Sequence, residues 1–147
     1  MQNNGFVYVA SLRRGYYRAA KNSALSLLDY WPEAKITLFT HAEWVEPEDY
    51  AIFENIITYG VPYHKRAKLW ALDKTPYDLT VYMDCDTEVQ HDDIRKIFEQ
   101  IPDDIDVIFT ANRPYNAALT KLSDTEEMTE HCGLFLYRNN PQTLNLM

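Results

Sequence analysis

Residues 79–87 read LTVYMDCDT, an apolar strand that runs directly into Asp84 and Asp86. Side chains alternate between the two faces of an extended chain, so residues i and i+2 point the same way and we expect these carboxylates to lie together. Two carboxylates held close repel each other, and a divalent cation between them relieves the repulsion. Ligands of open α/β sheets bind at the carboxyl ends of the strands, where this pair falls. The stretch therefore predicts a buried strand that delivers a metal site to a sheet edge.

Strands and helices are predicted to alternate on both sides of this stretch. Between Tyr17 and Trp31 the apolar residues fall at helical spacing, and Pro32 ends the run. Short alternation of strand and helix is typical of a parallel sheet with helices on both faces. We therefore predict an α/β fold with one doubly wound, mostly parallel, Rossmann-like sheet in a single domain over residues 1–147. The predicted strands are 6–10, 36–40, 56–59, 79–87, 106–110 and 133–137, and the predicted helices are 17–31, 47–54, 64–73 and 92–101, with a last helix beginning at Asn140-Pro141.

Charge and cysteine content exclude several classes of protein. A formal net charge of -8 argues against nucleic acid or an anionic membrane as the main partner. An anionic substrate then needs local basic residues or a metal in order to bind. Cys85 and Cys132 lack metal-ligand spacing and are typical of reduced thiols in a cytosolic chain. Neither a signal-peptide pattern nor an apolar run of membrane-helix length is found, so we expect a cytoplasmic protein without a membrane span.

Two segments resemble the nucleotide-sugar-dependent glycosyltransferases of GT-A fold. Residues 76–89, PYDLTVYMDCDTEV, are similar to that family's strand and DxD motif, with Asp84-Cys85-Asp86 as the DxD. Residues 131–138, HCGLFLYR, resemble the glycine-containing strand on the acceptor side of the family's pocket. The similarity follows the order of elements over nearly the whole chain. It implies a metal-dependent enzyme that moves a sugar from a nucleotide diphosphate, with a UDP-sugar favoured, to a carbohydrate or other hydroxyl acceptor.

The resemblance also implies roles for the two aspartates. In the family the second aspartate usually binds the metal directly, which is the role of Asp86 here. The first often reaches the metal through water or touches the ribose, and Asp84 matches that position. A Mg²⁺ or Mn²⁺ ion across the two phosphates stabilises the charge of the leaving group, and carboxylate oxygens suit such ions. The alternative is a solvated acidic strand end or a turn cap.

Basic residues precede the motif and also follow the first strand. Lys65, Arg66 and Lys68 form a cluster on the predicted helix before the motif, and Lys68 best matches the family position that contacts the donor. Arg13 and Arg14 follow the first predicted strand and offer another phosphate contact. The alternative for each of these residues is a solvated helix face.

The end of the first strand is the third part of the implied donor site. In the family, backbone groups and short side chains at this place hold the nucleobase and ribose, a role that falls here to Ala10 and Ser11. The alternative for Ser11 is a cap of the helix that follows.

Candidates for acid–base chemistry lie before and within the glycine strand. An inverting enzyme needs a carboxylate base near the acceptor hydroxyl, and Glu126, Glu127 and Glu130 lie in the polar segment before that strand. His131 stands where related enzymes often carry asparagine and is a candidate for contact with the donor sugar or the acceptor. The alternatives are a solvated charge run and a strand-end histidine, and a retaining enzyme needs no such base.

The end of the chain and the reaction itself leave alternatives open. Many relatives continue well past the glycine strand, whereas this sequence ends at Met147, which indicates a minimal or truncated form. We therefore expect an open acceptor side and slow, metal-dependent hydrolysis of the donor. One alternative is a non-catalytic module that binds nucleotide sugars or carbohydrates. A second is a DxD phosphatase of the haloacid-dehalogenase type, whose motif lies on its first strand instead of the fourth.

Overall fold

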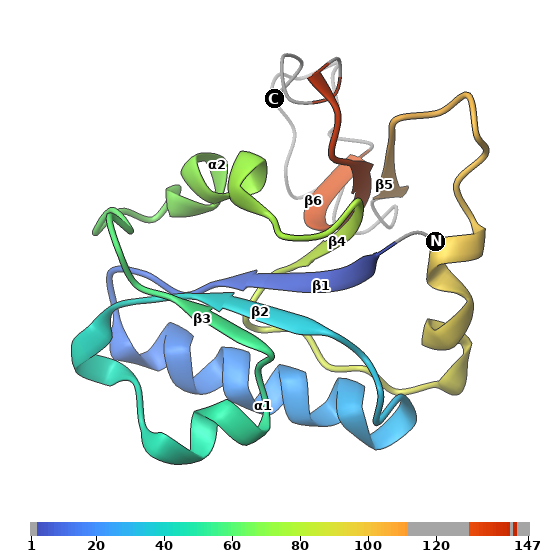
Figure 1. Ribbon diagram of the computed structural model, residues 1–147. Helices are drawn as coiled ribbons and strands as arrows, with labels where there is room; N and C mark the ends of the chain where they lie inside the picture. The colour runs from blue at the N-terminus through green and yellow to red at the C-terminus, as the bar shows by residue number, and fades with distance from the viewer. Residues whose placement is uncertain (1–2, 112–129, 142, 144–147) are drawn as a thin grey trace, which may run out of the picture.

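Six strands form one mixed sheet in the computed structural model, which describes residues 3–111, 130–141 and 143. The strands are β1 (Asn4–Val9), β2 (Ile36–Phe39), β3 (Asn55–Ile57), β4 (Leu79–Met83), β5 (Val107–Ala111) and β6 (Glu130–Arg138). Their order across the sheet is β3-β2-β1-β4-β6-β5 (Figure 1). Strands β3, β2, β1 and β4 pair in parallel, and β6 pairs antiparallel with both β4 and β5. The prediction of a mostly parallel α/β sheet is confirmed.

Helices cover both faces of this sheet. Helix α1 (Arg14–Tyr30) lies along one face and the short helix α2 (Ala67–Ala71) lies on the other (Figure 1). Four further segments are 3-10 helices, namely η1 (Ala42–Trp44), η2 (Pro47–Ala51), η3 (Leu72–Lys74) and η4 (Asp92–Glu99). No helix within the described residues is both long and apolar enough to cross a membrane.

Three of the predicted helices are shorter or tighter than expected. The prediction for 64–73 was wrong in length, since α2 begins only at Ala67. Before it, the Arg66 amide donates to His64 Nδ1 at 3.0 Å instead of to a helical carbonyl. The segments predicted at 47–54 and 92–101 are 3-10 helices, the form common in short pieces that lack the length to support a regular helix. Asn140 does act as the predicted cap, because its Oδ1 accepts from the Thr143 amide at 2.8 Å.

Strand β1 is buried on both faces, and its alternate residues belong to different cores. Phe6 and Tyr8 pack in the cluster that contains α1, whereas Val7 and Val9 pack in the cluster that contains α2. A central strand of a parallel sheet is covered on both sides, which is why residues 6–9 of this strand have no charged or amide side chain. Parity along the strand therefore decides which core a side chain enters.

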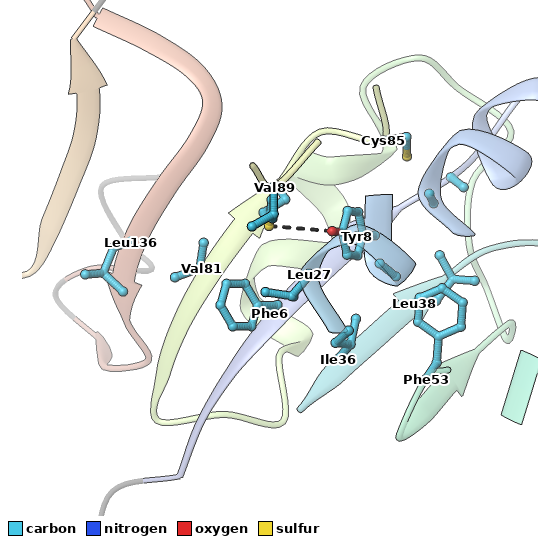
Figure 2. Packing of buried hydrophobic residues seen from close by; sticks show 14 of the residues in the cluster. Phe6, Tyr8, Leu27, Ile36, Leu38, Phe53, Val81, Cys85, Val89 and Leu136 are labelled. Atoms are coloured by element: carbon cyan, nitrogen blue, oxygen red, sulfur yellow. Dashed lines mark hydrogen bonds between the residues drawn. The ribbon is translucent and has the colours of Figure 1, made fainter. Parts of the chain in front are cut away.

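The core on the α1 side is shown in Figure 2, where side chains from β1, β2, α1 and β4 converge. Phe6 and Leu27 are completely buried there. The Tyr8 hydroxyl lies deep in this core, 2.7 Å from Ser23 Oγ and 3.6 Å from Met83 Sδ. Partners for a buried hydroxyl offset the cost of removing it from water, so this polar group is compatible with the core.

A buried ion pair fastens α1 to η2. Lys21 Nζ lies 2.7 Å from Asp49 Oδ1, and Asp49 is fully buried. The Tyr17 hydroxyl donates to Asp49 Oδ2 at 2.5 Å, and the Glu46 amide donates to the same oxygen at 2.9 Å. Burial alone would raise the pKa of the Asp49 carboxyl, but the hydrogen bonds from Glu46, Lys21 and Tyr17 outweigh it and lower the pKa. The carboxylate is therefore held ionised inside the protein.

We expect Asp49→Asn to lower the free energy of unfolding by about 3 kcal/mol, because it removes the buried carboxylate 2.7 Å from Lys21 Nζ and leaves Lys21 only its longer contacts with Glu46 and Glu48. The pKa of Asp49 is lowered below 3.8, so its contribution is present above that pH and is lost as the pH falls through the folded pKa. Urea titrations at several pH values, from about 2 to about 7, measure both the loss of stability and its dependence on pH. The control is Asp29→Asn on the exposed side of α1, which should change stability by no more than about 0.5 kcal/mol. Equal losses in the two variants would contradict the role of the pair.

Candidate functional site

A hollow of about 260 Å³ lies at the carboxyl ends of β1 and β4. Its walls come from the segment after β1, the start of α1, the start of α2 and the turn after β4. Five residues that the sequence singles out line it together: Ser11, Lys65, Lys68, Asp84 and Asp86. Two basic and two acidic side chains therefore share one cavity at the edge where α/β sheets bind ligands.

Strand parity places the two aspartates on the hollow. Strand β4 ends at Met83, and residues 85 and 86 form a turn. Cys85 points into the α1-side core, where its Sγ donates to the Val9 carbonyl at 3.2 Å. Asp84 and Asp86, one residue to either side, both line the hollow, and Cys85 also reaches it.

The Cys85 thiol, between the two aspartates, is expected to be unreactive. Burial, and then the negative charges of Asp84 and Asp86, raise the pKa of Cys85 to about 12. The thiolate is the reactive form of cysteine, so Cys85 is suited to packing and not to nucleophilic chemistry.

We expect Cys85 to resist alkylation in the folded protein. At pH 8 a thiol with a pKa of about 12 is ionised in about one molecule in ten thousand, against about a quarter for an ordinary cysteine. In a Cys132→Ser variant, which leaves Cys85 as the only thiol, iodoacetamide should react at least about a hundredfold more slowly with folded than with urea-unfolded protein. Equal rates would show that this turn is not packed as described.

Asp84 is held by two neighbours on the same oxygen. The Tyr82 hydroxyl donates to Asp84 Oδ1 at 2.7 Å, and Lys68 Nζ lies 3.9 Å from that oxygen. Lys68 Nζ also lies 5.3 Å from the centre of the Tyr82 ring. Burial, followed by the charge of Asp84, raises the pKa of Tyr82, so the phenol keeps its proton and remains a donor. Asp84 is therefore oriented by the protein before any ligand binds.

Asp86 offers its carboxylate outward. It is exposed and makes no hydrogen bond or ion pair with any residue that the structure describes. Carboxylate oxygens are the ligands that Mg²⁺ and Mn²⁺ prefer. Asp84 and Asp86 therefore fit a divalent cation chemically.

Ser11 lines the hollow, but its hydroxyl is engaged by protein groups. It donates to the Pro62 carbonyl and lies 2.9 Å from His41 Nε2 and 3.2 Å from the amide nitrogen of His64. The alternative of a helix cap is wrong, since the N-cap of α1 is Arg13 and makes no side-chain cap bond.

Other predicted donor contacts do not line the hollow. Ala10 is fully buried, its amide bonds β2 and its carbonyl accepts from the Thr40 hydroxyl at 2.9 Å. Arg13 is exposed at the start of α1, and Arg14 lies 3.4 Å from Glu46. Parity explains the first case, since Ala10 belongs to the α1-side core.

The acid–base candidates fall largely outside the described part of the chain. Glu130 and His131 begin β6, where their backbones pair with Ala111 and Thr110. Their side chains are not among the groups that the structure describes. Glu126 and Glu127 lie outside the described residues altogether. Their roles stay predictions.

Sequence reasoning missed both tyrosines and the histidine that line the hollow. Tyr82 had a signal, because it stands two positions before Asp84 on the same strand and so shares its face. His64 and Tyr16 line the same cavity without any pattern in the sequence that marks them.

A second acidic group is better explained as a helix cap. Ligand atoms of His91, Asp92 and Asp93 all lie within 4.8 Å of one another, and all three residues are exposed. His91 Nδ1, however, accepts from the Asp93 amide at 3.0 Å and caps η4. Its nitrogen is thus already used by the backbone.

No protein-family model and no curated protein matches the chain. Solved structures do match. The glycosyltransferase GlyE of Streptococcus pneumoniae TIGR4 aligns with a TM-score of 0.60 at 16% identity over 92% of this chain and 34% of its own. The galactosyltransferase LgtC, solved with donor and acceptor sugar analogues, aligns with a TM-score of 0.57 at 15% identity over 92% of this chain and 58% of its own. The bifunctional glycosyltransferase WbbM aligns with a TM-score of 0.62 at 12% identity over 95% of this chain and 32% of its own.

These likenesses establish the fold. The chain has the GT-A fold of glycosyltransferases, as its resemblance to that family predicts. It spans between 32% and 58% of the length of these structures, so it corresponds to one part of each.

Proposed function

We propose that this chain forms the donor-binding and catalytic domain of a glycosyltransferase that uses a nucleotide diphosphate sugar and a divalent cation. The observation that carries the proposal is the hollow in which Asp84 and Asp86 face Lys65 and Lys68. It lies at the carboxyl edge of a GT-A sheet, the edge where such folds bind nucleotides. The resemblance favours a UDP-sugar as donor.

Electrostatics support a cation in this site. A diphosphate that approached Asp84 and Asp86 without one would meet two carboxylates in a chain with a formal charge of -8. Mn²⁺ or Mg²⁺ held by these carboxylates would neutralise the charge that develops on the leaving diphosphate. The Asp86 carboxylate has no partner among the described residues and is available for this role, and the Tyr82 hydroxyl holds Asp84 in place beside it.

Lysine side chains supply the rest of the charge. Lys68 carries an ammonium 3.9 Å from Asp84 Oδ1, within the same cavity. A lysine is a compact donor with no required plane, which suits a phosphate oxygen or a sugar hydroxyl. Lys65 lines the cavity from the same segment and adds to the positive potential. For the acceptor side we propose Glu130 as base and His131 as a sugar contact, from their place at the start of β6.

We expect Asp86→Ala to abolish metal-dependent binding of UDP. The reason is that the substitution removes the proposed direct ligand of the cation that would join the protein to the diphosphate. Calorimetry with UDP in the presence and absence of Mn²⁺ measures the effect. The matched control is Asp92→Ala, an exposed aspartate of the second acidic group, which should bind as the wild type does. Loss of binding in Asp92→Ala with retention in Asp86→Ala would move the metal site to η4.

We expect Lys68→Ala to weaken UDP binding about tenfold or more, the size of a hydrogen bond between charged groups. The melting temperature should fall by only a few degrees, since the side chain is partly exposed. The control is Lys96→Ala on η4, whose side chain is 68% exposed. A variant that unfolds while its affinity is unchanged would make Lys68 a structural residue.

Turnover separates the enzyme from a binding module. We expect purified protein with Mn²⁺ to release UDP from a UDP-sugar slowly when no acceptor is present, and more slowly still in Asp84→Ala and Asp86→Ala. Chromatography of the free nucleotide measures the rate for each common donor. Binding without any release, from every donor tested, would favour the non-catalytic module. The phosphatase alternative does not fit the fold, since the motif follows β4.

A further inference from the structure

The hydroxyl of Ser11 has no hydrogen-bonding capacity left for a ligand. A serine hydroxyl has one proton to donate and two lone pairs that accept. Its proton goes to the Pro62 carbonyl. Its lone pairs receive the His64 amide, 3.2 Å away, and His41 Nε2, 2.9 Å away. A ribose hydroxyl would have to displace one of these groups.

The same count fixes the state of His41. Because the only proton of Ser11 is given to Pro62, the His41 Nε2 atom must carry a hydrogen and donate it. Burial lowers the pKa of His41, which favours the neutral ring. The ring also stacks on Tyr63 with centres 3.5 Å apart and planes 4° from parallel. Residues 62–64 are thus held in place by His41, just after β2, as well as by Ser11, just after β1. We call this set of contacts the clamp.

This clamp continues into α2. The His64 carbonyl accepts from the Ala67 amide at 3.1 Å, and His64 Nδ1 accepts from the Arg66 amide at 3.0 Å. His64 therefore accepts from two amides of the turn that leads into α2, the helix that carries Lys68. Lys68 in turn lies 3.9 Å from Asp84. An unbroken series of contacts runs from Ser11 through His64 to the lysine of the cavity.

We propose that Ser11 is a positioning residue, which sets the start of α2 and hence Lys68 against the aspartates and does not itself bind the donor. Its effect on α2 follows from the contacts alone. Its effect on ligand affinity rests on the proposed function. The two parts are tested by separate measurements.

The first measurement is amide hydrogen exchange in Ser11→Ala. Loss of the hydroxyl removes the acceptor of the His64 amide, so exchange at His64, Arg66 and Ala67 should become at least about tenfold faster. Ser11→Thr, which keeps a hydroxyl, should restore slow exchange. The control is Ser23→Ala, which removes a buried serine hydroxyl that bonds Tyr8 and Thr87, and should leave these three amides unchanged. Unchanged exchange in Ser11→Ala would overturn the proposal, and Ser11→Cys replaces that variant if it does not fold.

The second measurement is a double-mutant cycle with Lys68→Ala, using UDP with Mn²⁺ as the probe. If Ser11 acts through Lys68, Ser11→Ala should weaken UDP binding about tenfold in the wild-type background and less than about twofold in Lys68→Ala. Equal losses in both backgrounds would mean that Ser11 acts independently of Lys68, and would overturn the proposal. If the wild type binds no UDP, the proposed function fails while hydrogen exchange still decides the role of Ser11.

Discussion

Parallel pairing of β1 with β2 on one side and β4 on the other is the constraint on which the rest of the structure depends. Phe6 lies between Ile36 and Val81 in this ladder, and each of the three is buried. Both faces of β1 are covered, so a slip of one residue would send every side chain to the wrong core. The register is therefore fixed by packing on two sides at once.

The site follows from that register. Tyr82 belongs to the α2-side core, so the next residue of the same parity, Asp84, emerges at the carboxyl edge beside α2 and its lysine. Cys85 packs in the α1-side core and also reaches the hollow, which the aspartates on either side of it line. The site therefore lies where the strand runs beyond the core. Past Met83 the side chains are no longer covered by the helices, and polar residues take their place.

Much of this could be predicted from the sequence, because burial leaves a periodic record. The six strands, helix α1 and the shared side of Asp84 and Asp86 all follow from apolar spacing. The antiparallel direction of β6 could not be read, since an apolar strand looks the same in either direction. The contacts of Ser11 could not be read either, because its partners lie 30 and about 50 positions away and none is marked by a pattern. Short helices were overestimated because apolar spacing does not show where side chains compete for backbone amides.

The order of the strands also has a consequence for how the chain is made. Strand β2 can pair with β1 as soon as both have left the ribosome, but the other edge of β1 stays open until β4 follows, since Gly5 pairs with Thr80. An unpaired apolar strand edge is prone to join other chains. Contacts between segments so far apart also form slowly. The nascent protein therefore passes through an interval in which its central strand is half covered, and chaperones that shield strand edges would act in that interval.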